Sequence, residues 1–173
     1  MAGLLIRSFT PDDVTGLNTW VTDDEILLRF AGPGLRRPLT FDQLVAPADG
    51  TCLAFAVTEC ETGRPIGHAQ LRGIDRDARA CRIARVLIGE PELRGQGLGG
   101  ELLEVLVEYA SSSLGVAEVT LHVYSDNIPA IRCYRRFGFE FTGRPSSVPN
   151  AGKEMRYVVQ PSTEGRRFRL GSP

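Results

Sequence analysis

Glycine is concentrated directly in front of a long helical pattern, in the stretch PELRGQGLGGELLEVLVEYA at residues 91–110. Four glycines lie in its first half: Gly95, Gly97, Gly99 and Gly100. Leucine, valine and tyrosine then recur at three- and four-residue spacing with glutamates between them, which predicts an amphipathic helix over residues 97–113. Such a permissive backbone before a helix indicates that the chain there lies close against another group.

The start of that helix has the properties of an anion-binding site. The first turn of a helix leaves backbone N–H groups without partners, and the helix dipole makes this end positive. Glycines let those groups approach an anion with no Cβ atom in the way, and Arg94 adds a charged donor. The loop therefore predicts a phosphate site in front of the helix.

Three other kinds of glycine loop are alternatives to a phosphate site of this kind. A nucleoside-triphosphate loop needs Lys-Ser or Lys-Thr after its last glycine, whereas Gly99 is followed here by Gly100 and Glu101. The dinucleotide fingerprint G-x-G-x-x-G fits Gly95, Gly97 and Gly100. That fingerprint should open a parallel βαβ unit, whereas this loop follows predicted antiparallel strands. A tight strand-to-helix turn that binds nothing is the third alternative.

Composition and charge limit the class of protein. The chain has 173 residues, which suits one domain, and its 42% hydrophobic and 24% charged residues are typical of a soluble globular protein. Its net charge of -1 gives no general attraction to nucleic acid or to anionic membranes. No apolar run approaches the ~20 residues that span a bilayer, and the N-terminus lacks the pattern of a signal peptide. We expect a cytoplasmic protein.

Cysteine and histidine are too few and too scattered to predict a metal site. The four cysteines, at positions 52, 60, 81 and 133, form no C-x-x-C pair, and the two histidines are His68 and His122. Cys52 and Cys60 lie in or beside an apolar run, which favours small buried residues.

The order of predicted elements indicates a mixed α/β (α+β) sheet. Strands are expected at residues 4–6, 53–57, 66–74, 80–88, 117–124, 139–144 and 154–159, and helices at 10–21, 23–31, from 40, 97–113 and 127–137. The strands from 53 to 88 should form an antiparallel meander. We expect one domain over residues 1–160 and a flexible tail over 161–173.

Two motifs in this order resemble those of the GNAT superfamily of acetyl-CoA-dependent N-acetyltransferases. RGQGLG at 94–99 resembles the Arg/Gln-x-x-Gly-x-Gly/Ala loop, and RVLIG at 85–89 resembles the strand before it. LHVYSDNIPA at 121–130 and CYRRFGF at 133–139 resemble the second motif. The resemblance implies a single-domain, mostly antiparallel, twisted sheet of about six or seven strands, flanked by helices and with splayed central strands.

The resemblance also implies how acetyl-CoA binds as a cosubstrate. The pyrophosphate is held by the loop, the pantetheine arm pairs with the preceding strand, and an amide near Ile88 polarises the thioester carbonyl. The cofactor-binding residues so implied are Val86, Leu87, Ile88, Arg94, Gly95, Gln96, Gly97, Leu98, Gly99, Gly100, Asn127 and Tyr134. Asn127 either contacts the cofactor or caps its helix.

Tyr134 is the implied general acid that protonates the leaving thiolate, although a tyrosine there can also simply pack against Phe137 and Phe139. The base that takes the proton of the amine is open. Glu90, just past the strand, is the catalytic candidate. His68, on a face with Ile66 and Gln70, is more typical of a structural histidine, and so is His122.

Charges near the N-terminal helices give opposite indications about the acceptor. Asp23, Asp24 and Glu25 favour a cationic amine, whereas Arg36 and Arg37 favour an acidic one. We expect a small-molecule primary amine, such as a polyamine, amino sugar or amino acid, that attacks the thioester directly. Protein N-termini or lysines are alternatives, and so is a non-catalytic acyl-CoA-binding module. Dimers are common in the superfamily, so a homodimer is left open.

Overall fold

The computed structural model describes residues 3–47, 49–145 and 152–160, and the predicted tail over 161–173 lies outside them. The strands are β1 (Leu4–Ser8), β2 (Cys52–Glu59), β3 (Pro65–Asp75), β4 (Ala80–Ile88), β5 (Glu118–Tyr124), β6 (Glu140–Pro145) and β7 (Gly152–Val158). The helices are α1 (Asp13–Trp20), α2 (Asp24–Ala31), α3 (Phe41–Val45), the short 3-10 helix η1 (Pro91–Leu93), α4 (Leu98–Leu114) and α5 (Ile128–Phe137). The predicted elements are all present, with ends shifted by a few residues.

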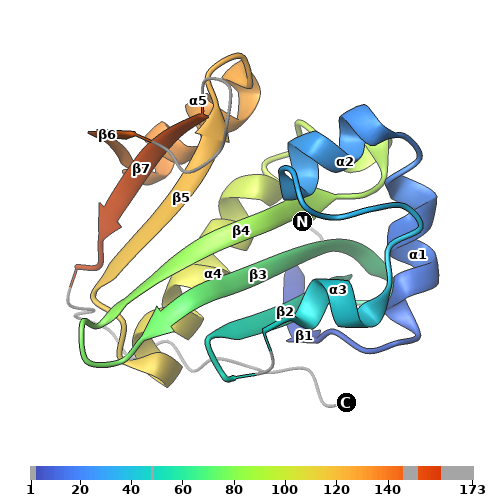
Figure 1. Ribbon diagram of the computed structural model, residues 1–173, viewed down its shortest axis with the longest axis horizontal. Coiled ribbons are helices and arrows are strands. Elements are labelled where there is room, and N and C mark those ends of the chain that lie inside the picture. Colours follow the sequence, from blue (N-terminus) through green and yellow to red (C-terminus); the bar gives the residue numbers. More distant parts are fainter. Residues whose placement is uncertain (1–2, 48, 146–151, 161–173) are drawn as a thin grey trace.

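The seven strands form one mixed sheet in the order β1-β2-β3-β4-β5-β7-β6 (Figure 1). Neighbouring strands are antiparallel except β4 and β5, which are parallel. The exception follows from the connection, because α4 carries the chain back from the end of β4 to the start of β5. The predicted mixed, mostly antiparallel sheet is confirmed.

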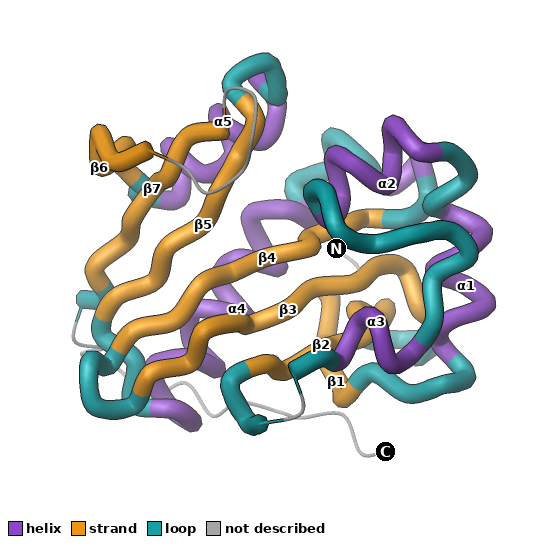
Figure 2. Tube along the Cα trace, in the orientation of Figure 1, coloured by secondary structure: helices purple, strands orange, loops and turns teal. Residues whose placement is uncertain are grey.

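The parallel pair separates halfway along its length. Pairing joins Ala80–Ile83 to Glu118–Leu121 and stops there. Just beyond, Arg85 has a left-handed φ of 51°. Between Ala84 and Leu87, two residues of β4 lie opposite a single residue of β3. This β-bulge bends β4 away from β5. Figures 1 and 2 show the two strands diverging toward α2 and α5, which confirms the predicted splay.

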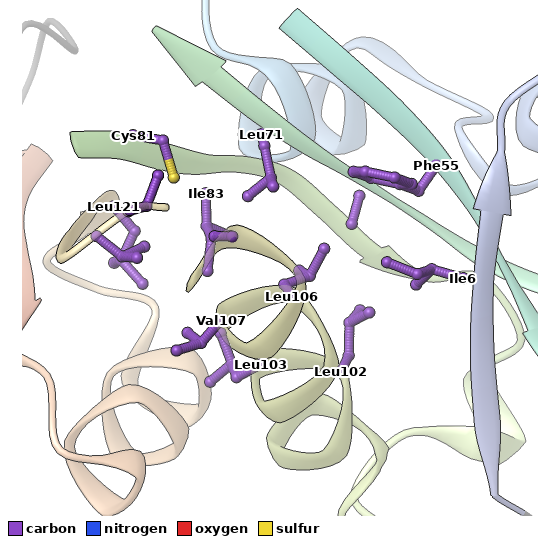
Figure 3. Packing of buried hydrophobic residues seen from close by; sticks show 14 of the residues in the cluster. Ile6, Phe55, Leu71, Cys81, Ile83, Leu102, Leu103, Leu106, Val107 and Leu121 are labelled. Atoms are coloured by element: carbon purple, nitrogen blue, oxygen red, sulfur yellow. The ribbon is translucent and has the colours of Figure 1, made fainter. Parts of the chain in front are cut away.

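Each face of the sheet is covered by its own helices. On one face, Leu102, Leu103 and Leu106 of α4 are almost fully buried against the strands (Figure 3). Burying each such side chain contributes about 1.5–3 kcal/mol. On the other face, α1 to α3 enclose a smaller cluster that includes Leu17, Phe30 and Leu44. Among the described residues, no helix is long and apolar enough to cross a membrane.

Candidate active site at the splayed strands

The glycine loop presents a row of backbone donors with no partner. Gly95 and Gly97 have φ values of 77° and 90°, which glycine adopts without strain. The amides of Gly100 and Glu101 donate to the Gly97 carbonyl, but those of residues 95–99 have no hydrogen-bond partner among the described residues. A Cβ added at Gly95, Gly97 or Gly100 would meet nothing within 4 Å. The row is therefore open on one side and suits an anion such as a pyrophosphate.

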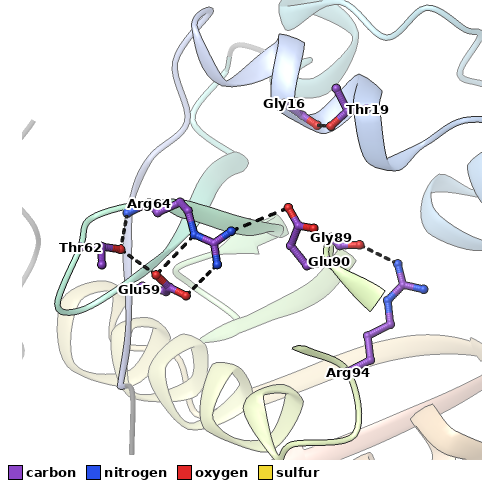
Figure 4. A network of polar contacts seen from close by, with 8 residues as sticks. All are labelled: Gly16, Thr19, Glu59, Thr62, Arg64, Gly89, Glu90 and Arg94. Carbon is purple, nitrogen blue, oxygen red and sulfur yellow. Dashed lines mark hydrogen bonds and ion pairs between the residues drawn. The ribbon is translucent and has the colours of Figure 1, made fainter. Parts of the chain in front are cut away.

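Arg94 fastens this loop to the end of β4. Its Nε donates to the Ile88 carbonyl at 3.0 Å and its Nη2 to the Gly89 carbonyl at 2.9 Å (Figure 4 draws the second bond). The sequence predicted a charged donor to phosphate at this position, and that role stays a prediction. In the structure, two of the three guanidinium nitrogens donate to the backbone, so Arg94 also sets the position of the loop.

The second half of β4 has a free edge. Gly89 donates its N–H to Ile66 on β3 at 2.8 Å. Because successive amides of a strand point to opposite sides, the Ile88 N–H points away from β3, toward the space left by β5. An extended molecule can pair with this edge as an added strand does.

A cavity of about 240 Å³ occupies the gap between the strands. Its lining includes Val86 of β4, Asn127 at the start of α5, and Tyr134 within α5. One side is closed by contacts between α2 and the end of β5: Arg29 pairs with Asp126 at 3.1 Å, and the Tyr124 hydroxyl donates to the Leu28 carbonyl at 3.4 Å. The cavity thus connects the free edge of β4 to the face covered by the N-terminal helices.

Tyr134 and Asn127 each serve the fold and also line the cavity. The Tyr134 ring lies against Phe139, with 6.1 Å between centroids, as expected of a packing aromatic. Burial, with a smaller contribution from the Cys133 thiol, raises the pKa of Tyr134 to about 12. Its hydroxyl is therefore protonated at neutral pH and can supply a proton. The Asn127 side chain accepts from the Ala130 N–H at 3.3 Å, so it caps α5.

The model of the acetyltransferase (GNAT) family matches residues 18–139. This range contains the glycine loop, the free edge of β4 and α5. The chain belongs to the GNAT family of acetyltransferases.

Known proteins support the assignment. The chain is 37% identical over 146 residues to an N-acetyltransferase 9-like protein of Nematostella vectensis, covering 79% of this chain and 74% of that protein. It is 38% identical over 106 residues to the spermine/spermidine N(1)-acetyltransferase of Bacillus subtilis, covering 53% of this chain and 68% of the relative. It spans only 27% of a mycothiol acetyltransferase of Brachybacterium faecium, to which it is 34% identical over 103 residues.

Solved structures show the same fold at low identity. A spermidine N-acetyltransferase of Vibrio cholerae in complex with CoA and spermine aligns with a TM-score of 0.72 at 22% identity, over 90% of this chain and 95% of that one. The aminoglycoside acetyltransferase AAC(6')-Ib in complex with coenzyme A aligns with a TM-score of 0.72 at 24% identity, over 90% and 95% of the two chains. As a GNAT protein, the chain is an acyltransferase.

The predicted catalytic Glu90 and several charges predicted for the acceptor site lie outside the cavity of this GNAT protein. The Glu90 side chain is partly exposed, with an oxygen 3.9 Å from Nη1 of Arg64 (Figure 4). Asp23 caps α2. Oδ1 of Asp24 lies 3.7 Å from Nη1 of Arg37, so the charges of Asp24 and Arg37 offset each other. Neither Glu90 nor the Asp24–Arg37 pair lines the cavity. A catalytic role for Glu90 stays a prediction.

His122 lines the cavity, a position the sequence had not linked to the chemistry. It faces away from its buried neighbours on β5. Its Nε2 lies 3.4 Å from a Glu154 carboxylate oxygen on β7. Burial and the charge of Arg82 lower the pKa of His122, against an opposing effect of Glu154. A neutral histidine with a carboxylate partner can accept a proton.

His68 is fully buried under the N-terminal helices. Its ring lies edge-on to Phe9 and Phe30, and it shares a face with Gln70 but not with Ile66, which packs in the α4-side cluster. The shifted register between β2 and β3 beside Ile66 explains this difference from the sequence prediction. Gln70 donates to Nε2 of His68, so Nδ1 carries the proton, with no partner in the described part of the chain.

Acidification is expected to destabilise the protein through His68. Burial and the nearby Arg85 lower the pKa of His68 from 6.5 to about 3. Between these values the unfolded chain binds a proton that the folded chain does not. The contribution of neutral His68 to the free energy of unfolding is therefore fully present above pH 6.5, and it is lost by about 1.4 kcal/mol per pH unit as the pH falls. Urea unfolding should therefore show that, from pH 7 to pH 5, the free energy of unfolding falls by about 2 kcal/mol more for the wild type than for His68→Gln. Equal losses would mean that His68 titrates in the folded state as it does in a free chain.

Proposed function

We propose that the chain transfers the acetyl group of acetyl-CoA to a small primary amine by direct attack. The row of amides at residues 95–99, which have no partner in the described part of the chain, carries this proposal, because it lies in front of α4 where a pyrophosphate is expected. The free edge of β4 suits the pantetheine arm, and the Ile88 N–H suits the thioester oxygen. One such oxyanion donor contributes about 3–4 kcal/mol to catalysis.

The reaction needs one bond made and one broken. The amine nitrogen bonds to the thioester carbon, and the C–S bond breaks to leave a thiolate. Tyr134 donates its proton to that thiolate, since its pKa of about 12 keeps it protonated at neutral pH. Coenzyme A and an acetylated amine are the products.

The acceptor is proposed to be a small molecule. A cavity of about 240 Å³ is smaller than the roughly 300–1,000 Å³ of most small-molecule sites, so it suits a small acceptor. The contacts between α2 and the end of β5 narrow its approach. Polyamines, amino sugars and amino acids all fit this description, and relatives include a spermine/spermidine, an L-amino acid and an aminoglycoside acetyltransferase. Acetylation of a protein N-terminus or lysine is the alternative, and it needs a wider opening.

Parallel calorimetric titrations with acetyl-CoA, CoA, ATP and NAD test the cofactor. Binding of the two CoA species alone is expected. Binding of NAD, or of none of the four, would contradict the proposed role of the glycine loop. A panel of amines followed by free-thiol release then separates an enzyme from a binding module, because the latter binds acetyl-CoA without turnover.

We also propose that His122 takes the proton of the attacking amine. Because its pKa is lowered, the acid limb of the pH–rate profile should lie below the ordinary histidine value of 6.5. His122→Gln should lower kcat/KM by about 100-fold and abolish that limb, measured from pH 5 to pH 8. A variant that retains the wild-type profile would show that water takes the proton instead.

A further inference from the structure

The cavity presents arginine side chains on the side of β3 and β4. Arg72, Arg82 and Arg85 belong to its lining, and Arg29 lies across from them on α2. None of the described residues that line the cavity is acidic. The charge of the acceptor site is therefore positive, whatever the charges elsewhere on the surface.

Sheet register brings these arginines together. Arg72 and Arg82 are directly opposite each other on neighbouring strands, which places their Cβ atoms about 5 Å apart. Arg85 joins them because the bulge that opens the splay also changes the direction of its side chain. Burial and the charge of Arg72 lower the pKa of Arg85 to about 10.

These three charges have no carboxylate partner among the described residues. Arg72 donates to the Gln70 side chain and to Cys52, and Arg85 to the Gln43 carbonyl. The acids on β5 and β7 are already paired: Glu118 with Arg156, and Glu154 with His122 and Thr142. Like charges directly opposite each other destabilise a sheet, so an anion that enters the cavity would relieve the repulsion. Arg29 differs from the three, since Glu25 and Asp126 neutralise it.

We propose that the acceptor is a primary amine that also carries an anionic group, a carboxylate or a phosphate, bound by Arg72, Arg82 and Arg85. This inference rests on the proposed acetyl transfer and narrows its substrate. The amine lies toward Tyr134 and the free edge of β4, while the anion lies toward the arginines. Polyamines lack the anion and add positive charge, so they are poor substrates, although two relatives are spermine or spermidine acetyltransferases by name.

Matched acceptors test the proposal directly. Lysine and cadaverine differ only in the carboxylate, as do ornithine and putrescine, and glucosamine 6-phosphate differs from glucosamine only in the phosphate. We expect kcat/KM to be about 10- to 100-fold higher for the anionic member of at least one pair, the range of one or two charge-assisted hydrogen bonds. The lysine and ornithine pairs report on a carboxylate, and the sugar pair reports on a phosphate.

A charge-reversal variant with a matched control links the preference to the arginines. Arg82 is exposed, so Arg82→Glu should fold and should reverse the preference toward the neutral or cationic member of each pair. Arg76→Glu makes the same charge change on the exposed turn between β3 and β4, outside the cavity, and should leave the preference unchanged. Circular dichroism and acetyl-CoA affinity confirm that both variants are intact.

The outcomes separate this inference from the proposed function. Equal or faster acetylation of the decarboxylated or unphosphorylated amines would overturn the inference and leave acetyl transfer standing. A preference that Arg82→Glu and Arg76→Glu change alike would also overturn it, as a general surface-charge effect. If no amine turns over, calorimetry of the acetylated products in the presence of CoA decides: tighter binding of an anionic product supports the inference, and equal binding refutes it. Failure to bind acetyl-CoA would refute the proposed function itself.

Discussion

A Tyr134→Phe protein is expected to bind acetyl-CoA as the wild type does and to turn over about 100- to 10,000-fold more slowly. Tyr134 lines the cavity, and the substitution removes only its hydroxyl while it keeps the ring that packs on Phe139. Without that proton donor, the thiolate must leave unassisted or take its proton from water. Free-thiol release gives kcat, and calorimetry gives the affinity for acetyl-CoA.

Cys133→Ala is the matched control on the same helix. The Cys133 thiol is half-buried, and burial raises its pKa, so it stays protonated and is a poor nucleophile. Its turnover should therefore stay close to that of the wild type. Complete loss of turnover in Cys133→Ala with acetyl-CoA binding intact would indicate an acetyl-enzyme intermediate in place of direct attack. Unchanged turnover of Tyr134→Phe across the pH range would refute the acid role of the tyrosine.

Gly67→Ala is expected to lower the free energy of unfolding by about 3 kcal/mol or more. Gly67 lies near the start of β3, between Val57 on β2 and Ile88 on β4. A Cβ atom there would overlap the backbone carbonyl oxygen of Leu87, which cannot move without displacing β4. The strand that forms the free edge would shift with it, so acetyl-CoA affinity should fall as well.

Gly16→Ala provides the control for this prediction. Gly16 lies within α1, and a Cβ atom there would meet nothing within 4 Å. Alanine restricts the unfolded chain and favours the helix, so this variant should be more stable by roughly 0.5–1 kcal/mol. Urea unfolding of both variants measures the difference. A Gly67→Ala protein as stable as the wild type would mean that β3 and β4 can separate at no cost.

Most elements of the fold could be predicted from short stretches of the chain. The glycines at 95–100 and the apolar spacing that follows them were enough for α4, and Asn127 with Gly138 marked the two ends of α5. These signals act within a few residues, through helix caps, turn conformations and side-chain periodicity. The separation of β4 from β5 was predicted only from the family resemblance, because the bulge at Arg85 has no local sequence signature.

The candidate site also has residues that local motifs predicted and residues whose positions only the structure shows. Tyr134, Asn127 and Val86 were predicted from motifs, and the structure brings all three to one cavity. The charges predicted from the N-terminal helices were less useful, since Asp24 and Arg37 pair with each other outside that cavity. Cys60 was expected to be buried and is exposed, because it lies in the turn just after β2.

The sequence by itself determined the helix and strand order, the glycine loop and the family, because each depends on residues close together in the chain. Tertiary structure alone decided which side chains share the cavity. The pairing of His122 with Glu154 and the opposition of Arg72 and Arg82 depend on strand register. A shift of one residue in that register would turn every one of these side chains to the other face of the sheet.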